Sequence, residues 1–167
     1  MKRLYFLLII ITTSACTEKK QTKQLIEQEV ATAWAEMSLY ITQYTPANSP
    51  TYASRCFGYI GLTMYESIVA GYSDYNSVVS ELNGLGNLPQ AETGKNYDWA
   101  LSLNAGQAEI LRSIYSQTSD ENKLKIDSLE SAIFEQFAEE IEDKEIAKRS
   151  AAYGKSIAEA IFAWSKT

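Results

Sequence analysis

The chain has 167 residues and a formal net charge of −6 at pH 7, and 46% of its residues are hydrophobic and 22% charged. These values fit one ordinary globular domain and exclude a disordered or collagen-like chain, and two cysteines are too few for a disulfide-stapled one. The sequence contains no histidine. That absence excludes, within this chain, Ser-His-Asp and Cys-His nucleophiles, histidine metal ligands and histidine acid–base catalysis.

The first fifteen residues have the pattern of a secretory signal. A basic start is followed by an unbroken apolar run over 4–11 and by small residues up to Ala15. The apolar run is too short for a bilayer, which needs about 20 residues. Small residues directly before Cys16 resemble a bacterial lipobox, so we predict a lipoprotein signal peptide over 1–15 and lipidation of Cys16. The alternative is a plain signal peptide cut near Ala15.

Residues 16–24 are polar and are predicted to tether the folded part to a membrane through the lipid on Cys16. This predicts an exported protein, a periplasmic or outer-membrane lipoprotein. Loss of 1–15 would remove two of the 15 basic residues, which leaves 13 against 21 acidic ones and a net charge near −8. Such a charge argues against nucleic acid as a partner and against electrostatic binding to anionic lipid.

The remaining domain, 25–167, shows helical periodicity and no sustained alternation typical of strands. The helical segments cover about 20–44, 50–70, 97–117, 119–141 and 143–166. We therefore predict an all-α fold, a bundle of about five helices with antiparallel neighbours where the connections are short. Between them, 71–98 is predicted to be irregular with a short helix at 75–82, and Thr118 with Glu121 matches a helix-capping box.

The segment 50–70 is apolar nearly all round, which predicts that it forms the central, buried helix. Ser49 is expected to cap this helix, and Pro50 fits its first position. Arg55 is one of two charged residues in the segment, and a buried guanidinium needs a partner, so we expect an ion pair with another helix.

Three small residues of the same segment have structural interpretations. Gly58 and Gly61 each cost about 1 kcal/mol relative to alanine in a helix and lie where neighbouring helices could approach closely. Cys56 has no intrachain partner if Cys16 carries lipid. Its place in an apolar pattern predicts a buried small hydrophobic side chain rather than a reactive thiol.

Two further features have a functional and a structural interpretation. The acidic cluster at 139–145 is the only candidate for carboxylate catalysis or metal binding, but it lacks the ligand spacing and central glycine of a calcium loop. We interpret it as a solvated turn between helices. The eleven tyrosines, six of them within 44–75, could form an aromatic binding surface or have buried rings with hydrated hydroxyls.

Three segments of the chain carry a resemblance to a known family. They are a helix with a central tryptophan, Trp34, the run SRCFGYIGLTMYESI at 54–68, and the run YGKSIAEAIFAWSK at 153–166. Together they resemble the N-terminal helical region of bacterial vanadium-dependent haloperoxidase-like proteins, which belong to the type 2 phosphatidic acid phosphatase superfamily. The resemblance implies an all-α bundle that binds vanadate or a phosphoryl group through lysine, arginines and histidines.

The catalytic motifs of that superfamily are a lysine followed by Arg-Pro, then Ser-Gly-His, then an arginine with a downstream histidine, and none occurs here. We therefore expect the non-catalytic N-terminal part of such a protein, truncated within or just after the helix that contains Trp164. No catalytic, metal-binding or cofactor-binding residue is expected in this chain. Vanadate or phosphate would bind the missing C-terminal part.

The alternative is a stand-alone helical binding or interaction lipoprotein of the cell envelope. For the chain under either hypothesis, the expected partners are the membrane, through Cys16, and either a second copy of the chain or the missing C-terminal half.

Overall fold

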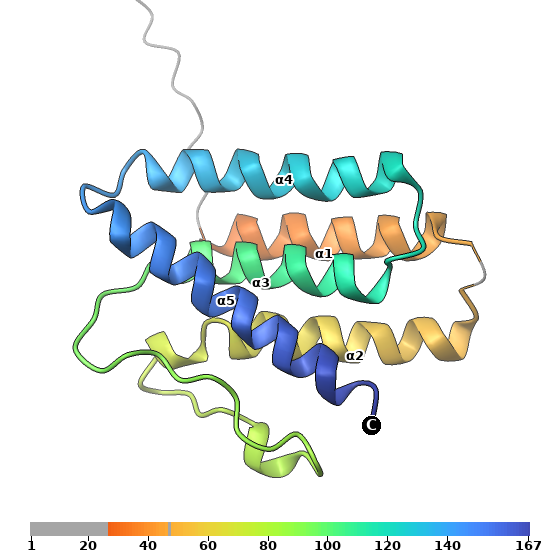
Figure 1. Cartoon of the computed structure of the whole chain (residues 1–167), viewed down its shortest axis with the longest axis horizontal. Helices are drawn as coiled ribbons and strands as arrows, with labels where there is room; N and C mark the ends of the chain where they lie inside the picture. The colour runs from red at the N-terminus through yellow and green to blue at the C-terminus, as the bar shows by residue number, and fades with distance from the viewer. Residues whose placement is uncertain (1–26, 47) are drawn as a thin grey trace, which may run out of the picture.

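The structure is a computed structural model that describes residues 27–46 and 48–167. The predicted signal peptide, tether and lipidation site at Cys16 lie outside the described residues. Within them the chain forms five α-helices and two short 3-10 turns and contains no strand (Figure 1). The elements are α1 (Glu27–Tyr44), α2 (Pro50–Glu66), η1 (Val69–Gly71), η2 (Val79–Glu81), α3 (Trp99–Ile114), α4 (Asp120–Ala138) and α5 (Lys144–Trp164). The predicted all-α bundle is confirmed.

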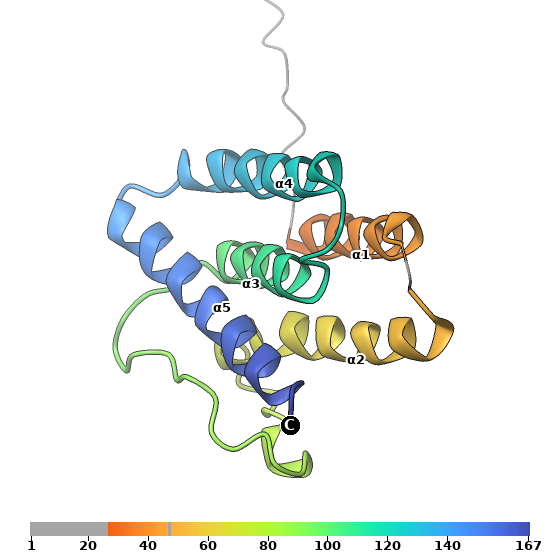
Figure 2. The same cartoon turned by 45° about the vertical axis from the view of Figure 1, so that its right-hand side comes forward.

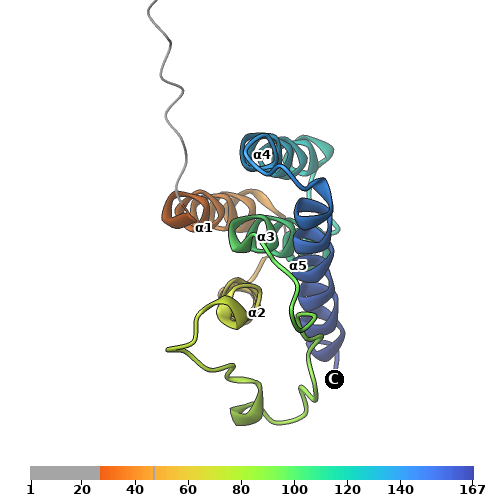
Figure 3. The same cartoon turned by 90° about the vertical axis from the view of Figure 1, so that its left-hand side faces the viewer.

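The central helix of the bundle is α3, which α1, α2, α4 and α5 surround when the molecule is seen from its end (Figure 3). Twelve of the sixteen residues of α3 are buried, against four of the seventeen in α2. The prediction that the segment 50–70 is the central and buried helix is therefore wrong. Much of the apolar surface of α2 faces outward. The small side chains of α3, in contrast, allow the other four helices to pack closely around it.

The helix α5 crosses obliquely over α3 (Figures 1 and 2). Both helices have a glycine where their backbones meet. A Cβ atom at Gly154 would overlap the backbone carbonyl of Ser102, and one at Gly106 would lie 3.1 Å from the Gly154 carbonyl oxygen. The two backbones approach so closely that only residues without a side chain fit. This contact fixes α5 against the middle of the bundle.

Polar side chains of α3 tie three other helices to it within the core. The indole N–H of Trp34 in α1 donates to Asn104 Oδ1 at 2.9 Å, and Asn104 Nδ2 donates to the carbonyl of Glu130 in α4 at 2.9 Å. Gln107 Nε2 donates to the carbonyl of Ile60 in α2 at 3.1 Å. Because buried polar groups are costly when unpaired, these bonds fix how α1, α2 and α4 sit on α3.

The helix starts follow local chemistry. Ser49 caps α2 and Pro50 is its first residue, as predicted. The predicted capping box at Thr118 is off by one residue, because Ser119 caps α4 and accepts the N–H of Asn122. Thr118 is instead buried, and its hydroxyl accepts a bond from the Asn122 side chain.

The connection from α2 to α3 runs outside the helices and returns to the start of α3 (Figure 2). The helix predicted at 75–82 is reduced to the 3-10 turn η2. Asp98 ends the connection: its carboxylate caps α3, and its backbone N–H donates to Ser150 Oγ on α5 at 2.8 Å. No helix within the described ranges combines the length and the apolar character needed to cross a membrane.

The buried hydrophobic core of the described residues extends in sequence from Val30 to Ile161. It includes residues of all five helices and of the connection at Leu85 and Leu88. A chain that begins after Cys16 would thus keep the whole of this core.

Candidate functional site

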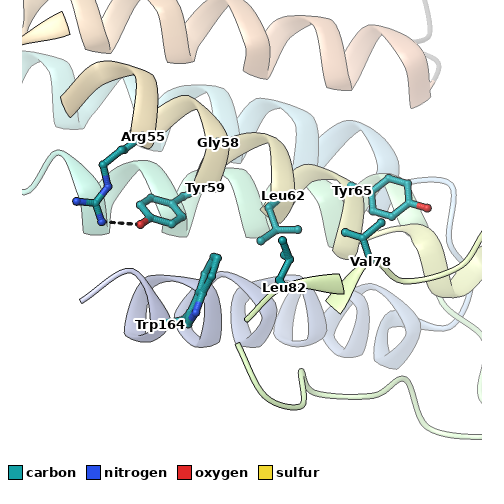
Figure 4. A pocket seen from close by; sticks show the side chains of 8 residues that line it. All are labelled: Arg55, Gly58, Tyr59, Leu62, Tyr65, Val78, Leu82 and Trp164. Atoms are coloured by element: carbon teal, nitrogen blue, oxygen red, sulfur yellow. Dashed lines mark hydrogen bonds between the residues drawn. The ribbon is translucent and has the colours of Figure 1, made fainter. Parts of the chain in front are cut away.

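An open, apolar groove of about 500 Å³ lies between α2, the η2 turn and the last turn of α5 (Figure 4). Its lining residues are Arg55, Gly58, Tyr59, Leu62, Tyr65, Val78, Leu82 and Trp164. This set is called the α2 groove below. It is a candidate binding site because pockets of this size and apolar character are typical of small-molecule sites.

The wall that α2 contributes follows from helical spacing. Arg55, Tyr59, Leu62 and Tyr65 follow one another at spacings of three or four along α2, so they share one face of the helix. Gly58 lies three positions after Arg55, beside Tyr59 on that face. This face is the one that α3 leaves uncovered. The apolar residues around segment 50–70 therefore lie on two faces of α2. One face packs into the core, and the other lines the groove.

The opposite wall is held in place by hydrogen bonds. Trp164 packs edge-on against Tyr59, with ring centroids 5.7 Å apart, and its indole N–H donates to the carbonyl of Asn83 at 3.2 Å. The buried Glu66 carboxylate accepts the backbone N–H of Val78 at 2.8 Å. The Tyr65 hydroxyl donates to the carbonyl of Asn76 at 2.7 Å, which fixes the same segment from α2.

Arg55 stands at one end of the α2 groove and is exposed (Figure 4). Its guanidinium donates to the Tyr59 hydroxyl at 2.9 Å and lies 5.8 Å from the centre of that ring. The bond to Tyr59 raises the pKa of Arg55 above its usual value. The expected ion pair between a buried Arg55 and another helix is wrong, because residue 55 lies on the outer face of α2, where water solvates the charge.

The two glycines of α2 do not mark a helix crossing within this structure. A Cβ atom built at Gly58 or at Gly61 would meet no atom within 4 Å. The expected close approach of a neighbouring helix is therefore absent among the described residues. At Gly58 the missing side chain instead leaves open the bottom of the α2 groove.

Cys56 lies on the inner side of the same helix and is 2% exposed. Burial raises the pKa of its thiol, which disfavours the reactive thiolate. The prediction of a buried, small hydrophobic side chain is confirmed.

The acidic cluster at 139–145 forms the connection between α4 and α5, as predicted. Asp143 caps α5 and accepts the N–H of Glu145 at 3.0 Å. In the described part of the chain, no three His, Cys, Asp or Glu side chains come together in a way that could hold a metal ion. The geometry gives this cluster the role of a helix connection.

Some tyrosines form part of an exposed aromatic surface and others are buried, so both predicted alternatives occur. Tyr59 and Tyr65 line the open groove, whereas Tyr153 is buried in a cluster with Tyr97 and Trp99. Burial, with the nearby Glu66 and Tyr97, raises the pKa of Tyr153 to about 12. This second cluster lies at the start of α3 and has a structural role.

The sequence predicts a single site residue, Cys16, which lies outside the described ranges. The sequence does not predict the α2 groove, because Val78 and Leu82 come from the irregular connection and Trp164 from the end of α5. The available signals were the excess of apolar residues around α2 and the apolar end of α5.

No protein-family model and no curated protein sequence matches the chain. Its structure is similar to that of a bacterial vanadium-dependent iodoperoxidase, with a TM-score of 0.68 and 25% sequence identity. The match covers 83% of this chain and 32% of the iodoperoxidase chain. The chain thus spans about a third of the length of the enzyme that it resembles in fold.

Among the residues that the structure describes, the arginines do not form a site for a vanadate ion. An oxyanion of this charge needs several cations and donors that converge on one point. Arg112 is paired with Asp127 and Glu130, Arg149 donates to a backbone carbonyl, and Arg55 lies at the end of the α2 groove. These arginines are engaged at separate places, and the sequence has no histidine to bind vanadium.

Proposed function

We propose that the chain is the N-terminal, non-catalytic helical part of an exported haloperoxidase-like or acid-phosphatase-like lipoprotein. The observation that carries the proposal is the fold likeness to the iodoperoxidase over 83% of this chain and only 32% of that enzyme. The same arrangement of helices is thereby joined, in the enzyme, to a much longer remainder. In this proposal the reaction belongs to groups that this chain does not supply.

The residues of the chain support the non-catalytic assignment. The sequence has no histidine, and its arginines are held apart by local partners. What the chain contributes is a rigid helical frame around α3. We infer that this frame supports a catalytic part of the kind that makes up the rest of the iodoperoxidase.

The DNA that follows codon 167 tests this function. The proposal expects a nearby reading frame that encodes Arg-Pro, Ser-Gly-His and an arginine with a downstream histidine. Co-expression of that frame with this chain should then give vanadate-dependent iodide or bromide oxidation, or phosphatase activity. A locus without any such frame would overturn the proposal.

We also propose that the chain is exported and anchored through lipid on Cys16, on the strength of the signal pattern over 1–15 and the polar stretch that follows. Metabolic labelling with a radioactive fatty acid tests it. The chain should incorporate label, and Cys16→Ser should lose it completely. Cys56→Ser is the matched control and should keep the label, whereas label that survives Cys16→Ser would refute the anchor.

A second candidate function is a stand-alone binding lipoprotein of the cell envelope. The open α2 groove favours it, because a chain whose described residues share one hydrophobic core and leave an apolar groove open has what a small binding protein needs. A chain of residues 17–167 should then unfold cooperatively on its own. An expanded state that binds hydrophobic dyes would count against this candidate.

A further inference from the structure

We propose that the α2 groove binds an anionic amphiphile, a carboxylate with an apolar body, with the carboxylate at Arg55 and the body between Tyr59, Trp164 and Leu62. This proposal goes beyond the function above and does not depend on it. It concerns a site that the fold likeness does not assign.

The chemistry of the lining selects an apolar body with one negative end. Of the eight lining residues, Arg55 alone is charged, and the others are aromatic, aliphatic or glycine. Figure 4 shows Arg55 at one end, Leu62 and Leu82 pointing toward each other in the middle, and Tyr65 with Val78 at the far end. A ligand with a single anionic end would therefore lie along the groove in one direction.

Arg55 has donors to offer to a carboxylate. A guanidinium carries five N–H donors, and the hydrogen bond to Tyr59 takes one of them. The side chain is exposed, so the other donors face water, and a carboxylate can replace that water with paired, charge-assisted bonds. Lys166 lines the adjoining hollow together with Arg55, so a second cation lies near the same end.

This end of the groove is positively charged, whereas the chain as a whole is negatively charged. The formal net charge is −6, so the general field of the molecule repels anions. An anionic ligand is therefore favoured only where local cations and an apolar surface occur together. The Arg55 end of the α2 groove meets both conditions.

The groove is preformed, and its space depends on one glycine. Its second wall is fixed by the bonds from Trp164, Glu66 and Tyr65 described above. A side chain at Gly58 would project into open space inside the groove, since its Cβ meets no atom within 4 Å. Gly61 is equally open but does not line the groove, which makes it a matched control.

The test is a titration of residues 17–167 with decanoate below its critical micelle concentration. Calorimetry and tryptophan fluorescence monitor the binding. Trp164 lies in the groove, whereas Trp34 is fully buried and Trp99 stacks on Tyr97 at the start of α3. A fluorescence change that persists in Trp99→Phe therefore reports on the groove. We expect saturable binding of one decanoate per chain. Decyltrimethylammonium, which has the same tail and the opposite charge, should bind at least about tenfold more weakly.

Two pairs of variants locate the ligand. Arg55→Gln should weaken decanoate binding by about tenfold or more, whereas Arg149→Gln should leave it unchanged. Arg149 is the matched control because its guanidinium also lies over a tyrosine ring, that of Tyr97, away from the groove. Gly58→Leu should abolish binding, and Gly61→Leu should not.

Several outcomes would overturn the proposal. They are an absence of saturable decanoate binding, equal affinity for the cationic amphiphile, and equal effects within either pair of variants. A dimer that Gly58→Leu breaks would assign the groove to a second copy of the chain and would also overturn it. Because Arg55 is exposed, Arg55→Gln keeps the test decisive even if Gly58→Leu does not fold. A failure here would leave the test of the reading frame beyond codon 167 untouched.

Discussion

The α3–α5 crossing and the outer face of α2 each contain two glycines, yet the structure uses them in opposite ways. At the crossing, a Cβ on Gly154 would overlap the backbone of Ser102. On α2, a Cβ on Gly58 or Gly61 would meet nothing within 4 Å. The first region is closed by contact between backbones, and the second is left open as one side of a groove.

The comparison shows that a glycine within a helical pattern has no fixed meaning in sequence. Each glycine lowers helix stability relative to alanine. Only at the crossing is this loss offset by close packing of two helices. The closed region holds the fold together, and the open region is available for binding. Substitutions that add or remove single groups can separate the two roles.

The largest effect is expected at the crossing. Gly154→Ala should lower the free energy of unfolding by about 3 kcal/mol or more, because the new methyl group meets backbone that cannot move aside. Chemical denaturation measures the change. A free energy of unfolding that is unchanged or raised, as expected for Gly61→Ala, would show that α3 and α5 are not in backbone contact.

The next effect concerns Tyr153, beside the crossing. Its pKa is about 12 in the folded chain, against an ordinary value of 10. Between these pH values the folded chain keeps a proton that the unfolded chain loses, so the free energy of unfolding should fall as pH rises from 10 through 12. The contribution is complete below pH 10 and amounts to at most about 3 kcal/mol.

Denaturation curves of Tyr153→Phe from pH 8 to pH 12 test this expectation. The variant should lose less stability over the upper part of the range than the unaltered chain. Other buried tyrosines, such as Tyr115, contribute to the general fall, so the difference between the two curves is the informative quantity. Curves of the same shape would contradict the burial of Tyr153.

A smaller effect distinguishes two indole hydrogen bonds, one in the core between α1 and α3 and one at the wall of the α2 groove. Asn104→Ala removes the acceptor of the fully buried Trp34 N–H and should cost about 2 kcal/mol, because that donor is left unpaired. Asn83→Ala is the matched control, since Trp164 donates to its backbone carbonyl, which remains. The control should change stability by less than about 0.5 kcal/mol. Equal losses would mean that Trp34 is not buried as described.

The smallest effect is a gain on the open face. Gly61→Ala should raise the free energy of unfolding by about 0.5 to 1 kcal/mol, because alanine favours the helix and its methyl group meets no neighbour. Thermal and chemical denaturation both measure it. A destabilised Gly61→Ala would mean that another part of the protein covers this face in solution.

The sequence predicted the helices well and their roles less well. Helical periodicity identified all five helices, and the chemistry of Ser49 and Pro50 predicted the start of α2. The choice of α2 as the central helix failed for a physical reason. Asn104 and Gln107 make α3 look like a surface helix, although both side chains are buried and bonded to other helices.

The candidate site was harder to predict than the fold. Arg55 was expected to be buried because its neighbours in the sequence are apolar, but exposure depends on which face of α2 meets α3. The groove also needs Val78 and Trp164, which only the tertiary structure brings beside Tyr59. Side chains from three separate segments leave no local pattern that a sequence could reveal.

The fold likeness to the iodoperoxidase leads us to propose that this chain supplies a helical frame without the groups of a vanadate site. The most direct measurement is a titration of residues 17–167 with orthovanadate, in which vanadium NMR and calorimetry detect binding. We predict no saturable binding up to millimolar vanadate and no iodide oxidation when hydrogen peroxide is added. Stoichiometric binding at micromolar vanadate would contradict it, because the groups of this chain would then form the oxyanion site.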